Sequence, residues 1–186
     1  HVGCIGISGG RGKDLWNYIK IKTDKKTDEP THAVILRTFL ADFRLSAYFA
    51  CEQVDVMNAI YEAFQSPYYA ITLGTSDELA KILTTVYFDN VIVTQSSDLS
   101  NTIVSGDYSR KFKFDWEKVE TIPIAETLRP PIVKKLPIDF SIDTGGVRKA
   151  SKFLTLTFLS DKQQLLKDVP VYKFANVSVP MVKFSG

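Results

Sequence analysis

The 186-residue chain has few of the residues on which metal sites, disulfide frameworks and hydrolytic triads depend. Its histidines are His1 and His32, and its cysteines are Cys4 and Cys51. Two histidines poorly supply a histidine-based metal site or a Ser-His-Asp triad. Two cysteines without Cys-x-x-Cys spacing make no disulfide framework and no zinc site, which indicates a reducing compartment and a cytoplasmic protein. We therefore expect no metal, no cofactor and no catalytic residue.

Long apolar runs are also missing. No stretch approaches the roughly 20 apolar residues of a membrane-spanning helix, so we expect no membrane partner. Hydrophobic residues make up 45% and charged residues 24% of the chain, which is typical of a globular protein and not of a disordered one. Because neither a methionine nor a signal peptide precedes His1, the chain is expected to be a fragment.

Nucleotide-binding loops are missing as well, although residues 1–13 contain five glycines. A Walker loop needs glycine where Ile7 stands and serine or threonine where Asp14 stands. A dinucleotide fingerprint needs glycine at Leu15. What remains is a glycine-rich segment that permits close backbone approach and ends in two bases, Arg11 and Lys13.

The charge is small in sum and uneven along the chain. The net charge of +2 divides into +3 for residues 1–50, −6 for residues 51–100 and +5 for residues 101–186. Basic flanks around an acidic middle indicate one surface for polyanions and another that faces water. Charges scattered over a solvated surface explain the same numbers, and both interpretations stay open.

The first half of the chain shows strand and helix patterns. Residues 15–22 read as a strand and residues 23–31 as a charged loop. Residues 39–49 alternate most clearly, with the phenylalanines on a predicted core face and Asp42 and Arg44 on a polar open face. A core-facing helix that ends at Ser66-Pro67 is predicted by the spacing of Val54, Met57, Ile60, Tyr61 and Phe64.

A capping box predicts a second helix. A short strand over residues 68–73 ends at Gly74, after which Thr75 would cap a helix and Glu78 would return to it. Glycine permits a positive φ at such a junction, and the free N–H groups of a helix start favour a nearby phosphate. Gly74, Thr75 and Ser76 are therefore candidates for binding phosphate; the alternative is that Gly74 only makes the turn.

The second half changes character. A strand over residues 88–94 ends the first half, and short alternating runs between Ser-, Asn- and Pro-rich loops then predict a β-rich region over residues 95–186. Pro137 makes residues 132–138 an edge or extended segment, and Gly145-Gly146 predicts a turn. The aromatic residues Phe112 and Trp116 are expected on the surface, where partners would cover them.

Residues 38–83 resemble the CRISPR-associated Cas five family, which holds the 5′ handle of crRNA in type I Cascade complexes. The residues that carry the resemblance are Leu40-Ala41-Asp42-x-Arg44, Pro67-Tyr68-Tyr69 and Leu73-Gly74-Thr75-Ser76. Residues 2–6 are similar to the family's first glycine-containing helix, and the C-terminal segments are similar, more weakly, to its β-region. The sequence departs from the family at Thr75, where an arginine is common.

The resemblance implies an α+β protein. Residues 1–94 would form an RRM-like (ferredoxin-like) domain that lacks its first strand and carries a short thumb-like loop, and residues 95–186 a β-rich C-terminal region. The implied function is a non-catalytic RNA-binding subunit. Its partners would be the crRNA 5′ handle, the Cascade backbone subunit, the large subunit and, indirectly, target DNA. One basic RNA-binding surface is expected from Arg11, Lys13, Lys20, Lys22, Lys25, Lys26 and Arg37, together with Gly74, Thr75 and Ser76.

Two other functions remain open at this point. One is a metal-independent endoribonuclease that processes crRNA, with His32 or a tyrosine–lysine pair as general acid and base. The other is a β-rich protein-interaction module that binds no nucleic acid. RNA cleavage in EDTA would identify the first, and absence of RNA retention at any salt concentration would identify the second.

Overall fold

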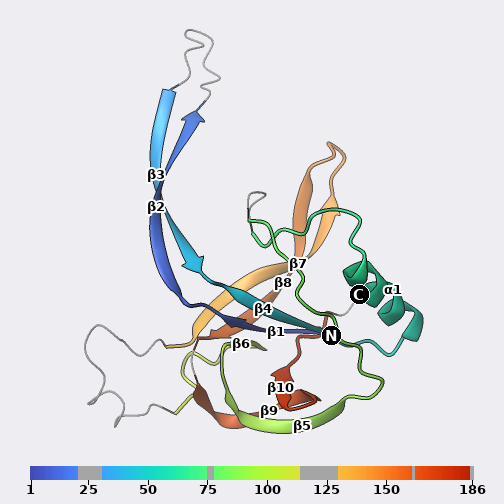
Figure 1. Cartoon of the computed structure of the whole chain (residues 1–186). Helices are drawn as coiled ribbons and strands as arrows, with labels where there is room; N and C mark the ends of the chain where they lie inside the picture. Colours follow the sequence, from blue (N-terminus) through green and yellow to red (C-terminus); the bar gives the residue numbers. More distant parts are fainter. Residues whose placement is uncertain (21–30, 75–77, 114–129, 161, 185–186) are drawn as a thin grey trace. The chain divides into compact units, whose positions relative to one another are not determined.

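The fold is mostly β. The computed structural model describes residues 1–20, 31–74, 78–113, 130–160 and 162–184 (Figure 1). Strands account for 57% and helix for 8% of the structure, with a curled antiparallel sheet that forms half a barrel. The predicted α+β RRM-like, ferredoxin-like fold is therefore wrong. Its second helix does not form among the described residues, and the strands there make sheets of five, three and two strands.

Three sheets and one helix, α1 (Val54–Gln65), make up the described part. The largest sheet has the order β4-β1-β6-β8-β7, with β4 (Arg44–Phe49), β1 (Val2–Ile7), β6 (Thr102–Ser105), β8 (Arg148–Leu159) and β7 (Ile132–Ile142). A second has the order β10-β9-β5, with β10 (Val177–Pro180), β9 (Gln163–Phe174) and β5 (Ile92–Leu99). The third pairs β2 (Gly10–Lys20) with β3 (Thr31–Ala41).

The chain divides into two compact units. The smaller unit, residues 6–45, holds the β2–β3 hairpin, and the larger unit holds residues 1–5 and 46–186. The boundary expected near residue 94 falls within β5 of the larger unit.

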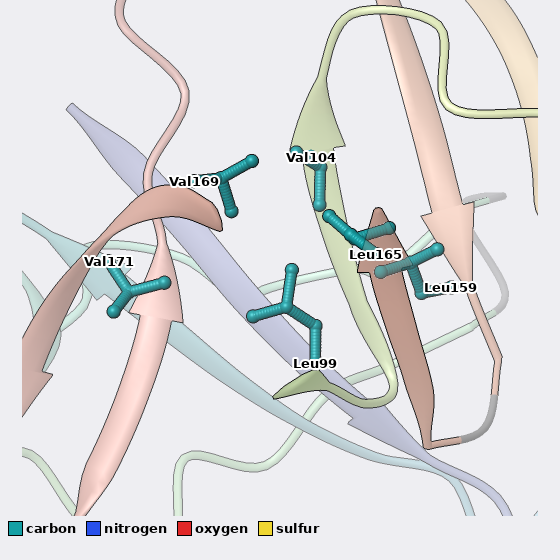
Figure 2. Packing of buried hydrophobic residues seen from close by; sticks show 6 residues of the cluster. All are labelled: Leu99, Val104, Leu159, Leu165, Val169 and Val171. Atoms are coloured by element: carbon teal, nitrogen blue, oxygen red, sulfur yellow. The ribbon is translucent and has the colours of Figure 1, made fainter. Parts of the chain in front are cut away.

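The core lies in the larger unit, where β5, β6, β8 and β9 bury their alternating apolar side chains. Figure 2 shows this cluster of Leu99, Val104, Leu159, Leu165, Val169 and Val171. Tyr108 and Phe112 pack against it. The expectation that Phe112 is a surface residue is therefore wrong; Trp116 lies outside the described residues.

A buried hydroxyl joins the core to a loop. Thr157, which is fully buried, accepts a hydrogen bond from the Tyr108 N–H (3.0 Å) and donates one to the Gly106 carbonyl (2.6 Å). Its polar atom is thus satisfied, as burial requires.

The predicted strand over residues 39–49 is two strands. β3 ends at Ala41 and β4 begins at Arg44, because Asp42 has a φ of +46° that an extended strand does not tolerate. The predicted core face is also wrong in its first part, since Phe39, Phe43 and Leu45 are each about two-fifths exposed. Residues 2–6, expected to be helical, lie in β1.

The predicted helix is confirmed as α1, and Ser66 is its C-cap residue. The predicted core-facing side chains are not buried: Val54 is 63% exposed, and the other four are half-buried. Phe64 contacts Phe49, and Tyr61 contacts Tyr87. Residues 78–91 contain no helix, and the strand predicted over residues 88–94 begins at Ile92 instead. Residues 68–73 hold a single bridge in place of the predicted strand.

The strand patterns of the second half are confirmed where they are described. β7 is an edge strand of its sheet and contains Pro137, as predicted. The turn at Gly145-Gly146 also forms: the Asp143 N–H donates to the Val147 carbonyl at 3.0 Å, and Gly146 has a φ of +76°.

Candidate nucleic-acid interface

The β2–β3 hairpin carries the described cations of the predicted basic surface. Its two strands of 11 residues pair in register from Gly10↔Ala41 to Lys20↔Thr31. The sequence predicted only the outer part of β2 and placed a loop where β3 begins. The thumb-like element is thus a long two-stranded ribbon, shown in blue in Figure 1.

The register divides the cations between two faces. Residues that lie directly opposite each other share a face, and the face changes with every residue along a strand. Arg11 and Lys13 therefore share one face with Leu40 and Thr38. Arg37 lies opposite Asp14 on the other face.

The face of Arg37 is aromatic. The guanidinium of Arg37 lies over the Trp16 ring, 4.9 Å from its centre, and the Trp16 side chain is 45% exposed. Phe39 covers Gly12, its cross-strand neighbour, so closely that a Cβ at Gly12 would meet the ring. Half-buried Tyr18 continues this face beyond Trp16. Trp16 was not among the predicted site residues. Its position between Lys13 and Lys20, in a segment predicted as a strand, is the sequence signal that could have found it.

The face of Arg11 and Lys13 is aliphatic beyond the two cations. Its exposed fractions are 70% for Leu15, 64% for Val34, 56% for Leu36 and 59% for Ile19. A two-stranded hairpin in water is marginally stable, and exposed apolar side chains in a row are typical of a surface that a partner covers.

The other four predicted cations lie at the end of the hairpin or outside the described residues. Lys20 pairs with Thr31 at the last position of the hairpin. Lys22, Lys25 and Lys26 lie outside the described residues. Residues 21–30 contain these three lysines together with Asp24, Asp28 and Glu29, so this segment adds no net charge.

Gly74 has the positive φ that the sequence indicated, +108°. The helix predicted after it does not form over residues 78–91. The Leu73 N–H donates to the Glu78 carbonyl at 2.9 Å and the Ala80 N–H to the Ile71 carbonyl at 2.8 Å, so extended backbone returns after the turn. The helix on which the predicted phosphate site depended is thus not present over residues 78–91, and Thr75 and Ser76 lie outside the described residues.

Both histidines lie among the described residues. His32 is an exposed residue of β3 that lies opposite Ile19. His1 contacts Tyr172, with 2.5 Å between the ring Nδ1 and the hydroxyl. Among the described ranges, no three His, Cys, Asp or Glu side chains gather closely enough to hold a metal ion.

A groove of about 400 Å³ lies between the end of α1 and the segments that follow it. Phe64, Tyr69, Ile71 and Leu83 contribute to its walls. The groove contains no charged side chain, so it adds nothing to a polyanion site.

A second cationic hairpin was not predicted as a site. β7 and β8 carry Lys134, Lys135, Arg148, Lys149 and Lys152 against Asp139 and Asp143. Arg148 lies 3.8 Å from the centre of the Phe140 ring, and Lys135 lies 5.7 Å from that of Phe153. The Lys-Lys and Arg-Lys pairs of this segment are the sequence signal that could have found it.

One carboxylate in this hairpin is tuned by its turn. Asp143 accepts hydrogen bonds from the N–H groups of Val147 (2.9 Å) and Gly145 (3.0 Å), and its other oxygen lies 2.9 Å from the Lys149 Nζ. The hydrogen bond from Lys149, followed by those from the backbone, holds the pKa of Asp143 below its ordinary value.

Comparison with known proteins identifies no relative. No protein-family pattern, curated protein or solved structure matches this chain. Within the described part of the chain, no helix has both the length and the apolar character that crossing a membrane requires.

Proposed function

We propose that this chain is a non-catalytic RNA-binding subunit of a type I CRISPR Cascade complex, acting in the cytoplasm, and that it holds the crRNA 5′ handle. The observation that carries the proposal is the β2–β3 hairpin, which joins Arg11, Lys13 and Arg37 to an exposed tryptophan. The resemblance of residues 38–83 to the Cas five family is the reason for proposing the crRNA 5′ handle as the RNA that is bound.

The cations of the hairpin suit a sugar–phosphate backbone. Arg11 and Lys13 are exposed and lie two residues apart on one face, at about 6.6 Å along the strand. Both are available for phosphate oxygens, which receive most protein contacts in nucleic-acid complexes. No acidic residue occurs on that face of the paired strands, so the local charge is positive.

The aromatic face suits unpaired bases. Bases of single-stranded RNA stack on exposed aromatic rings and on arginine planes, and such stacking contributes about 1–3 kcal/mol per base. Trp16, with Arg37 over its ring, provides both kinds of surface at one place. The handle would therefore wrap around an edge of the hairpin, with phosphates at Arg11 and Lys13 on one face and a base at Trp16 on the other.

The aliphatic side chains suit the protein partners of the complex. Leu15, Val34 and Leu36 are more than half exposed and share the face of Arg11 and Lys13. The backbone subunit or the large subunit would cover them, and target DNA would be reached only through the assembled complex.

RNA affinity and its salt dependence test the proposal. Binding of a fluorescein-labelled 20-nucleotide single-stranded RNA would be measured by anisotropy between 50 and 300 mM salt. We expect R11E/K13E to weaken binding at least tenfold and to reduce the salt slope by about 1.4, because two phosphate contacts are lost. The matched control K167E/K173E reverses two exposed lysines of β9 and should change affinity less than twofold.

Two results would overturn the proposal. Salt-independent binding, or equal binding by R11E/K13E and the wild type, would leave the hairpin without a role in RNA recognition. Cleavage of the labelled RNA by the purified chain in EDTA would show an endoribonuclease instead of a non-catalytic subunit.

A further inference from the structure

We infer that the β7–β8 hairpin is a second polynucleotide site, which takes single-stranded nucleic acid independently of the β2–β3 hairpin. It goes beyond the proposed function because nothing in the predicted handle-binding surface involves residues 132–159. The hairpin belongs wholly to the larger unit, and all its residues are described (Figure 1, orange).

Charge complementarity points to a polyanion. Residues 132–159 carry five bases against two acids, a net charge of +3 within a single hairpin. One acid is already engaged, because Asp143 pairs with Lys149 and accepts the turn's N–H groups. Lys134, Lys135 and Arg148 are all exposed to solvent. A charge of this kind attracts phosphates and loses its effect as salt rises.

The aromatic rings favour a polynucleotide over an acidic protein. Phe140 and Phe153 are 40% and 47% exposed, and each has a cation over or beside its ring. Arg148 lies 3.8 Å from the Phe140 ring centre, so its exposed guanidinium extends the ring as a second layer. Rings and arginine planes stack with bases, whereas an acidic peptide offers mostly carboxylates and no planar bases.

The backbone separates the two cation–ring pairs. The β7–β8 pairing is regular from Ile132↔Phe158 to Pro137↔Phe153 and shifts register between Pro137 and Phe140. Bulges bend a strand and redirect its side chains. Lys135 and Phe153 lie before the shift and Arg148 and Phe140 beyond it, so successive nucleotides would meet one pair and then the other.

A single-stranded nucleic acid is favoured as the ligand, because in a duplex the faces of the bases are stacked on one another and cannot reach the aromatic rings. We expect a preference for unpaired RNA or DNA, with little sequence selectivity, since every base has a stacking face. The shared chemistry is a phosphate backbone with accessible bases, which single-stranded RNA and single-stranded DNA both offer. Probes of each kind distinguish them.

The experiment uses the full chain in the wild-type and R11E/K13E backgrounds, so that the two hairpins are tested separately. Labelled U20 RNA, dT20 DNA, a 20-base-pair duplex and poly-L-glutamate of equal charge would be titrated by anisotropy. In the R11E/K13E background, where the β7–β8 hairpin is the remaining site, K135E/R148E should weaken U20 or dT20 binding about tenfold and reduce the salt slope by about 1.4. In the wild-type background the loss should be smaller, because the β2–β3 hairpin still binds the probe. K167E/K173E again serves as the charge-matched control, with less than a twofold change expected.

A second variant tests stacking without altering charge. In the R11E/K13E background, F140L/F153L should weaken binding to single strands by about fivefold or more and leave the salt slope unchanged. Circular dichroism and the melting temperature establish that each variant is folded; if K135E/R148E is not, K135Q/R148Q replaces it. Unchanged affinity in the charge variants would overturn the inference, and so would equal binding of poly-L-glutamate with no effect of F140L/F153L. Failure of R11E/K13E alone would overturn only the proposed function.

Discussion

Arg37 lies over the Trp16 ring across the two strands of the β2–β3 hairpin, with its guanidinium carbon 4.9 Å from the ring centre. Asp14 is the residue directly opposite Arg37, so the cation has a ring as its diagonal neighbour and a carboxylate as its cross-strand neighbour. A tryptophan held in this way is preorganised, because its ring loses little further freedom when a base stacks on it.

The first prediction concerns this ring. We expect Trp16→Ala to weaken single-stranded RNA binding about tenfold, the lower part of the range for loss of one stacked base. Trp16→Phe, which keeps a ring, should lose less than threefold. Leu15→Ala is the matched control because Leu15 is the neighbouring residue on the opposite face. Equal losses for Trp16→Ala and Leu15→Ala by anisotropy would contradict a stacking role.

Local patterns in the sequence predicted those elements that local forces determine. Helix α1 follows from its apolar spacing and its Ser-Pro end, and the β-rich character of residues 95–186 follows from their short alternating runs. The turn at Gly145-Gly146 follows from glycine chemistry. For the candidate site, the net charge of +3 over residues 1–50 was enough to select Arg11, Lys13 and Arg37 as candidate RNA-binding residues.

Long-range pairing determines what the sequence could not show. Leu79 pairs with Thr72 in an antiparallel bridge, and this extended backbone replaces the helix that the capping box indicated. The alternation of residues 39–49 contains no sign of the break at Asp42, because its left-handed φ arises where the chain leaves the hairpin for β4. The division of cations between two faces depends on the register of β2 and β3, which only the structure supplies.

Gly3 provides a prediction about the larger unit. A Cβ at Gly3 would lie 2.6 Å from the Met181 sulfur and 2.8 Å from the Pro180 carbonyl oxygen. Because the backbone oxygen cannot move aside alone, Gly3→Ala should lower the free energy of unfolding by about 1–3 kcal/mol, as overpacking does. Gly10→Ala has open space around it and should change the urea midpoint little. A destabilisation equal to that of Gly10→Ala would show that β1 adjusts freely.

Gly74 gives a prediction that separates turn geometry from RNA binding. Its φ of +108° is unfavourable for a residue with a Cβ, and an alanine Cβ would also meet the Glu78 carboxylate. Gly74→Ala should therefore destabilise the chain by about 1 kcal/mol in urea unfolding. RNA affinity of the folded variant should stay within twofold of the wild type, since no helix start follows Gly74 among the described residues. A tenfold loss of affinity would restore a phosphate role for this turn.

The two cysteines should differ in reactivity. Burial raises the pKa of the Cys4 thiol above its ordinary value, whereas Cys51 is exposed. At pH 8, iodoacetamide should therefore modify Cys51 at least tenfold faster than Cys4 in the folded protein. Peptide mass spectrometry of a time course measures both rates, and the urea-unfolded chain is the control in which the rates should converge. Equal rates in the folded state would contradict the packing around Cys4.

The last prediction is a pH dependence that Asp143 brings to the β7–β8 turn. Its pKa is held down by Lys149 and then by the Val147 and Gly145 N–H groups, so the folded state favours the charged carboxylate. Such a group adds stability above its unfolded pKa, near 3.9, and this stability is lost as pH falls through the lower folded pKa. Asp143→Asn keeps a carbonyl oxygen for the turn's N–H groups and removes the charge that Lys149 meets.

The wild type should therefore exceed Asp143→Asn in urea midpoint at pH 7, and the difference should shrink as the pH is lowered from 4 to 2. Other carboxylates, including Asp107, whose pKa is lowered by its hydrogen bonds with Ser109, titrate in both proteins and cancel in the difference. Lys149→Gln is the matched partner variant, because it removes the same ion pair from the opposite side. A midpoint difference that is equal at pH 7 and pH 2 would mean that the charge of Asp143 does not stabilise the turn, and that its hydrogen bonds alone hold it.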